Sequence, residues 1–264
     1  MSRKRTGYPI KLERWYYRKQ VQMVREWQEQ ANKSLNLIEP FVKGGTKILT
    51  DADNSNNPDW MHYVQQVLDL MSSDIKNCQT DQELDSVTRR YVIAISSFSA
   101  NKVRQRVGTV KINAGIVALN PLKDNAKLRE YVTGKIIENT NLIKTMRQRY
   151  IDQTKADIYR SINSGGGVSD LAHSIVARTG MTLRHADLIA TDQTGKILAQ
   201  IDKYRNMQAG STRYIWRSME DRRVRPKHRE LDGKEFKYDD PTGGDDGQLP
   251  GEPIRCRCYQ QPVD

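Results

Sequence analysis

The periodicity of the apolar residues changes once along the chain, and this change constrains the fold more than any other feature. Up to Ile201 the apolar residues recur at the spacing of an amphipathic helix. After Gly210 they alternate with polar residues, as in residues 212–217, which is the pattern of a half-buried strand. The sequence therefore predicts an α+β protein, with a mainly helical N-terminal body followed by a small C-terminal domain of helices plus a short antiparallel sheet.

Glycines divide the helical part of the sequence. The three glycines at 165–167 predict a joint, because ordering three glycines in a row costs the most backbone entropy. Beyond them we expect two helices over residues 169–179 and 182–207, separated at Gly180. The predicted domains are a basic aromatic N-terminal arm and helix at 1–57, a helical domain at 58–164 and a C-terminal domain at 168–264.

Two short motifs predict where elements begin and where the chain reverses. Thr80 and Glu83 form a capping box, in which each side chain accepts a hydrogen bond from the backbone N–H of the other residue. Asp232-Gly233 has the composition of a β-hairpin turn, since both positions tolerate positive φ. Together with a last strand over residues 254–260, this hairpin completes the predicted sheet.

Charge and cysteine content restrict the setting of the protein. The net charge is +11, and the basic residues concentrate at 1–50 and 101–150, which favours contact with a polyanion such as double-stranded DNA. Three cysteines are too few for a disulfide framework, which indicates a reducing compartment. Since no apolar run could cross a bilayer or act as a secretory signal, we expect a soluble protein made and kept inside a cell, or inside something assembled there, with no membrane partner.

Two groups of residues are candidate contact surfaces. Cations of the second basic zone could contact DNA phosphates, although a solvated helix face would have the same pattern. The candidates for DNA contact are Lys102, Arg104, Arg106, Lys144, Arg147 and Arg149. Near the N-terminus, rings alternate with cations, either as a docking arm or simply as the first turns of a packed helix. The candidates for docking are Tyr8, Arg14, Trp15, Tyr16, Tyr17 and Arg18.

Three residues near the C-terminus are candidate metal ligands. Cys256 and Cys258 are two residues apart in a predicted strand, so their side chains should point to the same face. With His228 they could supply three ligands to zinc, and Asp221 or Asp232 could supply a fourth. The alternative is that both cysteines are small buried hydrophobic residues and that no cofactor is bound.

The order of motifs between Trp216 and Cys258 resembles the C-terminal domain of the Mu F-like phage head proteins. The similar elements are Trp216 in a strand, Asp221-Arg222-Arg223-Val224-Arg225, His228, the Asp232-Gly233 turn, Pro250-Gly251 and Arg255-Cys256-Arg257-Cys258. Residues 138–144, the glycine joint and the helix pair also resemble that family, so the resemblance covers residues 136–264. The chain departs from it at residues 190–193, where many members have Arg-Thr-Glu, and at residues 225–228, where many have Cys-x-x-Cys.

The resemblance implies a structural minor head protein of a tailed bacteriophage rather than an enzyme. It implies incorporation through the portal protein, with the major capsid or scaffold protein as further partners. The expected location is the interior of the virion head near the portal vertex, with a role in head assembly and in DNA packaging or ejection. Two alternatives act outside the virion: a zinc-stabilised DNA-binding protein, and a nuclease built on His228. No second histidine lies near His228 in sequence, and the common hydrolase and phosphate-loop motifs are missing, which argues against the nuclease.

Overall fold

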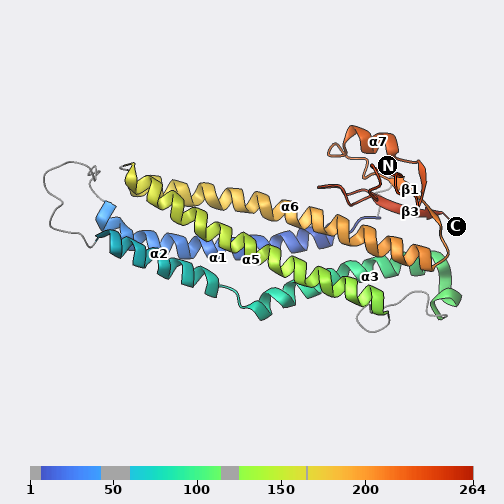
Figure 1. Ribbon diagram of the computed structural model, residues 1–264, viewed down its shortest axis with the longest axis horizontal. Coiled ribbons are helices and arrows are strands. Elements are labelled where there is room, and N and C mark those ends of the chain that lie inside the picture. The colour runs from blue at the N-terminus through green and yellow to red at the C-terminus, as the bar shows by residue number, and fades with distance from the viewer. Residues whose placement is uncertain (1–6, 43–59, 114–124, 165, 264) are drawn as a thin grey trace. The chain divides into compact units, whose positions relative to one another are not determined.

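Helices dominate the protein (Figure 1). The computed structural model describes residues 7–42, 60–113, 125–164 and 166–263. The helices are α1 (Ile10–Val42), α2 (Trp60–Asn77), α3 (Asp81–Asn113), α5 (Ala126–Asn163), α6 (Val168–Gln208) and α7 (Pro226–Leu231). The strands are β1 (Arg213–Arg217), β2 (Glu235–Lys237) and β3 (Tyr259–Val263). The predicted α+β class, a helical body followed by a small antiparallel sheet, is confirmed.

The three strands form an antiparallel sheet in the order β2-β1-β3. Arg213 is the register partner of Lys237 on one side of β1 and of Val263 on the other. Alternate residues of β1 point into the core, where Tyr214 and Trp216 are buried, as the alternating sequence pattern predicts. They pack in a cluster with Ala199, Tyr238, Leu249, Cys256 and Cys258.

The predicted hairpin at Asp232-Gly233 is wrong. Residues 226–231 form helix α7 instead of a strand, because Pro226 is well suited to the first turn of a helix. Gly233, at φ +84°, turns the chain from α7 into β2, which pairs with β1. The last strand also differs from the prediction, because β3 begins only at Tyr259 and the cysteines lie in the segment before it.

The two helices predicted over residues 169–179 and 182–207 are one continuous helix, α6. Gly180 does not interrupt it, because a single glycine within a helix costs only about 1 kcal/mol relative to alanine. Thr182 does not cap a new helix either, since its hydroxyl donates to the carbonyl of Arg178 one turn back, at 3.0 Å. The buried face of α6 continues past both residues, from Ile175 through Thr179 and Thr182 to Ala186.

The described residues form two compact units, each assembled from separated segments. Unit 1 draws on the ranges Met1–Tyr17, Asp85–Thr140 and Asp187–Asp264, and unit 2 on Arg18–Leu84 and Asn141–Ala186. These units cut across the predicted ranges 1–57, 58–164 and 168–264. The prediction that residues 168–264 form a domain of their own is untested, but the contacts between α3 and α6 lead us to expect that this range does not fold alone. The predicted boundary between residues 57 and 58 lies outside the described residues.

Unit 2 consists of helices around a buried tryptophan. Trp27 is fully buried, and its indole N–H donates to Oε1 of Gln79 at 2.8 Å. The predicted capping box at the start of α3 is confirmed, with Thr80 N–H to Glu83 Oε2 at 2.8 Å and Glu83 N–H to Thr80 Oγ1 at 3.2 Å. The buried apolar side chains and the hydrogen-bonded helix ends therefore stabilise this unit.

In unit 1, polar contacts join α3 to α6. The hydroxyl of Tyr91 lies 2.6 Å from Oγ1 of Thr194, and Asp202 accepts hydrogen bonds from Ser99 at 2.5 Å and Lys102 at 2.7 Å. All of these atoms except the lysine nitrogen are buried, so each contact satisfies a group that would otherwise be costly to desolvate. Arg205 is also buried and donates to the carbonyl and hydroxyl oxygens of Ser96.

Candidate metal centre

His228, Cys256 and Cys258 form one buried cluster in unit 1. Nδ1 of His228 lies 3.5 Å from Sγ of Cys256 and 3.6 Å from Sγ of Cys258, and all three atoms lie within 4.8 Å of one another. Each residue is only 2–3% exposed. The structure thus brings together the three residues that the sequence predicts as metal ligands, although the cysteines are not in a strand.

Helix α7 and one glycine of α6 position this cluster. His228 lies in the first turn of α7, and the ring of Trp216 meets the imidazole edge-on with 5.1 Å between ring centroids. A Cβ at Gly195 in α6 would lie 2.4 Å from the carbonyl oxygen of Gly251 and 2.6 Å from that of Cys256. The segment that carries the cysteines can therefore lie against α6 only because residue 195 has no side chain.

The second ring nitrogen of His228 is held by a carboxylate. Nε2 lies 2.9 Å from Oδ2 of Asp245, whose Oδ1 lies 2.5 Å from Nζ of Lys227. Burial opposes ionisation of Asp245, but Lys227 and His228 outweigh it and lower its pKa. Burial likewise opposes a charge on His228, yet its contacts with Cys256 and Asp245 raise the pKa of the imidazole above the usual value.

The two thiols differ in acidity. The hydrogen bond from the Cys258 thiol is the largest effect on Cys256, and with His228 it lowers the pKa of Cys256 to about 5 against the opposing effect of burial. The backbone N–H of Cys258 also donates to this sulfur, at 3.4 Å. The same interaction and burial raise the pKa of Cys258. The cluster therefore holds one thiolate readily, and thiolate is the form that binds metals or acts as a nucleophile.

The side chains of Cys256, His228 and Asp245 also contact one another in the spatial order of a catalytic nucleophile, its general base and an orienting carboxylate. Two observations favour metal ligation over this arrangement. Both sulfurs lie at nearly the same distance from one nitrogen, whereas a nucleophile needs only one thiol. The adjoining cavity, lined by the cluster and by arginines, has a volume of about 20 Å³, which is room for one water and not for a substrate.

Neither aspartate predicted as the fourth ligand belongs to the cluster. Asp221 accepts two hydrogen bonds from Arg257, at 2.8 and 2.7 Å, and Asp232 accepts from the backbone N–H of Ser218 at 2.9 Å. Both carboxylates instead stabilise the conformation of the surrounding backbone. Asp245 is the carboxylate that contacts the cluster, and it was not predicted because several aspartates in that loop are equivalent by sequence.

Comparison with known proteins shows which family this part of the chain resembles. The family model of Phage Mu protein F like proteins matches residues 152–261, which include the whole cluster. This stretch is a Mu F-like region. The predicted resemblance over residues 136–264 is thus confirmed for residues 152–261.

One relative matches more than half of the chain. A protein of Haemophilus influenzae, described as an uncharacterized protein, is 32% identical over 154 residues, which cover 58% of this chain. The chain covers only 34% of the length of that protein. No solved structure matches the chain. Among the described helices, none combines the length and apolar character needed to cross a membrane.

Most residues predicted to contact DNA have partners within the protein. Nζ of Lys102 contacts Asp202 at 2.7 Å, and Arg106 donates to Oγ of Ser211 at 2.6 Å. In unit 2, Lys144 pairs with Asp81 at 2.7 Å. Arg147 donates to the carbonyls of Lys76 and Gln79 at 2.8 and 2.9 Å, so it satisfies the end of α2. Of the predicted set, Arg149 is exposed and Arg104 is partly exposed.

The predicted docking residues divide into buried and accessible ones. Tyr8 and Tyr16 belong to the core: the Tyr8 hydroxyl donates to Glu13 at 2.5 Å, and the Tyr16 ring stacks on Tyr91 at a centroid distance of 3.8 Å. These two side chains are therefore not available to a partner. Arg14 and Arg18 are exposed, and Trp15 and Tyr17 are partly exposed. The N-terminal residues described are a packed helix and not an extended arm.

The residue before this helix packs against the last strand. A Cβ at Gly7 would lie 2.0 Å from Cδ2 of the Tyr259 ring, and the carbonyl of Gly7 accepts a hydrogen bond from Lys102 at 3.2 Å. The Lys102 ammonium also lies 5.7 Å from the centroid of the Tyr259 ring. Segments from opposite ends of the described chain thus share one packing site within unit 1.

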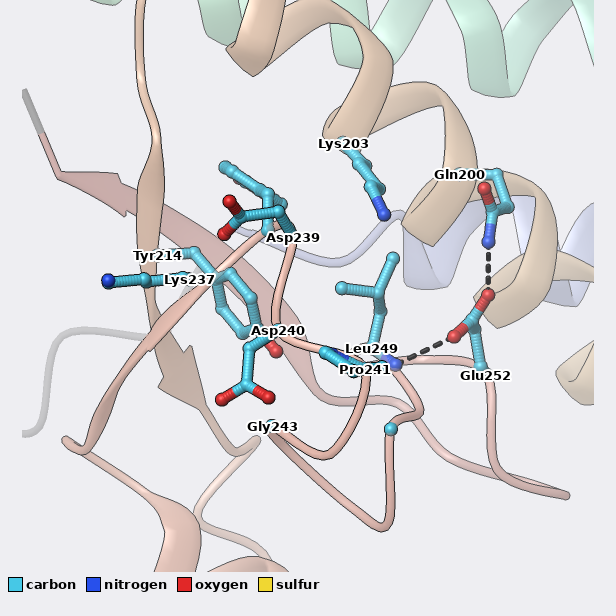
Figure 2. A pocket seen from close by; sticks show the side chains of 12 residues that line it. Gln200, Lys203, Tyr214, Lys237, Asp239, Asp240, Pro241, Gly243, Leu249 and Glu252 are labelled. Carbon is cyan, nitrogen blue, oxygen red and sulfur yellow. Dashed lines mark hydrogen bonds between the residues drawn. The ribbon is translucent and has the colours of Figure 1, made fainter.

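A larger polar pocket lies between α6 and the loop after β2 (Figure 2). Its volume is about 430 Å³, and Figure 2 shows Gln200 reaching Glu252, which also accepts from the backbone N–H of Leu249 at 2.6 Å. Lys203, Lys237, Asp239 and Asp240 give it mixed charge. This pocket was not predicted from the sequence.

Proposed function

We propose that this chain is a structural minor head protein of a tailed bacteriophage. It lies inside the virion head near the portal vertex, and it acts in head assembly and in DNA packaging or ejection. The observation that carries this proposal is the Mu F-like region over residues 152–261. In this proposal the portal protein is its main partner, and the major capsid or scaffold protein is a further one.

The accessible part of the predicted docking residues is our candidate portal contact. Arg14, Trp15, Tyr17 and Arg18 are consecutive or nearly consecutive in α1, and none of them is buried. The guanidinium of Arg90 lies over the Trp15 ring at 5.3 Å from its centroid, which adds a cation to the same surface. Tryptophan, tyrosine and arginine are the residue types enriched at interface hot spots. We call Arg14, Trp15, Tyr17 and Arg18 the α1 docking set.

Contact with DNA is the second part of the proposal, and the net charge of +11 supports it. Arg104 and Arg149 are its best remaining candidates, because Lys102, Arg106 and Lys144 already have partners within the protein. A sequence-independent contact of this kind would depend on phosphate charge and on the release of counterions.

A structural role fits the cluster better than catalysis by His228. Both ring nitrogens of this residue face groups of the protein, Nε2 toward Asp245 and Nδ1 toward the two thiols. A nuclease would need a base or metal site that a phosphodiester can reach, and this imidazole is 2% exposed. Incubation of the protein with DNA and Mg²⁺ or Zn²⁺ tests the alternative, and we expect no cleavage.

The portal proposal is tested by incorporation into heads. In cells that produce the complete head proteins of the phage encoding this chain, we expect the wild-type protein to co-purify with heads. Its signal should be lost when the portal protein is omitted. Arg14→Glu with Arg18→Glu should strongly reduce incorporation, whereas the matched control Lys127→Glu with Arg129→Glu reverses two exposed cations of α5 and should not.

Three outcomes would overturn parts of this proposal. A protein absent from wild-type heads would contradict the head location. Normal incorporation without the portal protein would contradict the portal contact. Equal incorporation of both double variants would assign the contact to a surface other than the α1 docking set.

The DNA contact is tested separately through its salt dependence. Affinity for double-stranded DNA should fall steeply from 50 to 200 mM salt, and Arg104→Glu with Arg149→Glu should weaken binding and reduce the slope by roughly two phosphate contacts. Binding that does not change with salt, or that is unaffected by these two substitutions, would assign the charge to protein contacts.

A further inference from the structure

The two nitrogen-to-sulfur distances in the buried cluster match those of a tetrahedral zinc site. Typical bonds from zinc are 2.3 Å to sulfur and 2.0–2.1 Å to nitrogen, and at a tetrahedral angle they place a sulfur and a nitrogen roughly 3.6 Å apart. The observed distances from Nδ1 of His228 are 3.5 Å to Cys256 and 3.6 Å to Cys258. We propose that these three residues bind one Zn²⁺ ion, which fastens α7 to the segment before β3.

Asp245 gives His228 the orientation that such a site needs. Its Oδ2 lies 2.9 Å from Nε2, so a neutral imidazole bound to zinc would carry its proton at Nε2 and direct the Nδ1 lone pair toward the ion. A carboxylate behind a ligating histidine is the usual outer contact in zinc sites, and its loss commonly weakens metal binding about 10- to 100-fold. Lys227 in turn holds Asp245, at 2.5 Å. We therefore assign Asp245 as a positioning residue and not as a ligand.

The cavity beside the cluster accounts for the fourth ligand. Its volume of about 20 Å³ accommodates one water, and its walls include all three proposed ligands. Arg223, Arg225, Arg255 and Arg257 form the rest of its lining together with Met219 and Val224. Two thiolates would neutralise Zn²⁺, and the arginines would favour an oxygen ligand with negative character. We assign water as the fourth ligand.

The ion would act as a cross-link within the Mu F-like region. His228 is separated by 28 residues from Cys256 and by 30 from Cys258, so the site closes a loop that contains β2 and the turns after it. Closing a loop of this length removes many conformations from the unfolded chain. The proposal is independent of the portal location, because it concerns only the stability of this region.

The test is metal analysis of the full-length protein purified without chelator. We expect about one zinc per chain in the wild type and in the control variant Cys78→Ser, because Cys78 lies in the turn before α3, far in sequence from the cluster. Cys256→Ser, Cys258→Ser and His228→Gln should each lose the ion. Replacement of zinc by Co²⁺ should give the absorption bands of a tetrahedral site with thiolate ligands. Asp245→Asn should keep the ion with about 10- to 100-fold weaker affinity.

Two results of the metal analysis would overturn the proposal. One is wild-type protein that is folded but takes up neither zinc nor cobalt, and the other is zinc that persists in all three ligand variants. Because a ligand variant could fail to fold, the wild type is also stripped of metal with a chelator and melted. We expect a lower Tm that returns when zinc is restored. An unchanged Tm in verified metal-free protein would overturn the role as a cross-link.

Discussion

Unit 2 and the sheet region, residues 209–263 of unit 1, are stabilised in different ways. Unit 2 is helical, and its interior is made of apolar side chains such as the fully buried Trp27. In the sheet region, the described residues include eight with positive φ, and three of them, Glu220, Asp246 and Arg255, are not glycine. Each of these three costs about 1–2 kcal/mol. Specific polar contacts must offset that cost, so the sheet region depends on individual side chains more than unit 2 does.

Burial decides which ion pairs matter in each region. Arg257 in the sheet region has a side chain only 6% exposed and is neutralised by Asp221, while His228 is held by Asp245. In unit 2 the pair of Lys155 and Asp69 lies at the surface, whereas the side chains of Arg178 and Asp157 are only 17% and 11% exposed. Loss of one partner should therefore matter more for the buried pairs, where a charge would be left unpaired, than for Lys155 and Asp69.

The largest effect is expected when the chain is shortened at the glycine joint, residues 165–167. A fragment of residues 168–264 lacks α3, whose Ser99 and Lys102 donate hydrogen bonds to the buried Asp202 and whose Ser96 accepts from the buried Arg205. We expect this fragment to show no cooperative thermal transition by circular dichroism, whereas the full chain melts cooperatively. A sharp transition in the fragment would show that the sheet region needs no partner outside residues 168–264.

The next largest effect is expected in the core of unit 2. Trp27→Ala should lower the free energy of unfolding by about 3–5 kcal/mol, because it leaves a cavity. It also removes the donor to Gln79. Urea denaturation followed by circular dichroism measures the change. The control is Trp15→Ala, which affects a partly exposed ring and should cost much less; equal losses would contradict the described burial.

A small-to-large change tests the packing of the sheet region against the N-terminal segment. Gly7→Ala places a methyl group against the Tyr259 ring and should cost about 1–3 kcal/mol through overpacking. In a Tyr259→Ala background the same change should cost much less, because the clashing ring is gone. Denaturant titrations of the four proteins give the coupling energy. Additive effects on the free energy of unfolding would mean that Gly7 and Tyr259 do not interact.

The pair of Asp221 and Arg257 predicts a pH dependence. Burial opposes ionisation of Asp221, but Arg257 outweighs it and lowers the pKa of the carboxyl below its ordinary value of 3.8. The stabilisation is therefore present above that ordinary value and is lost as the pH falls through the lowered pKa. Asp221→Asn should cost about 1–2 kcal/mol at pH 7, with its carboxylate partly exposed, and should flatten the decline of Tm below pH 4. An unchanged acid profile would contradict the pair.

The smallest effect is expected for an exposed pair of the same region. Arg213 and Glu235 lie 2.9 Å apart on neighbouring strands, but their side chains are 53% and 42% exposed. Glu235→Gln should change the free energy of unfolding by less than about 0.5 kcal/mol, because surface ion pairs are screened by water and salt. A loss comparable to that of Asp221→Asn would mean that burial does not decide which pairs matter here.

The sequence predicts the helical part of the fold better than the sheet region, for a physical reason. The capping box of Thr80 and Glu83 involves residues three apart, and the apolar period is also a local pattern. The hairpin prediction at Asp232-Gly233 failed because the turn motif says nothing about the residues before it, and Pro226 begins a helix there. The continuity of α6 across Gly180 depends on its packing and not on that residue.

The same distinction applies to the candidate site. His228, Cys256 and Cys258 could be predicted because histidine and cysteine are uncommon here and have specific chemistry. The role of Asp245 could not, since only the folded loop shows which aspartate meets the imidazole. The need for glycine at position 195 was missed, because it arises from the close approach of the Gly251 and Cys256 carbonyl oxygens, which only the folded chain shows.

The contact between the N-terminal segment and the end of the chain has a consequence for synthesis on the ribosome. Tyr8 is separated by 183 residues from Thr191, whose carbonyl accepts its hydrogen bond, and Gly7 packs on Tyr259 still later in the chain. At a translation rate of about 5–20 residues per second, the first of these partners is made roughly 10–40 s after Tyr8. Gly7 and Tyr8, which precede α1, must therefore remain without these partners until Thr191 and Tyr259 have been made. The last residue of unit 2 is Ala186, so unit 2 is completely synthesised before unit 1 is.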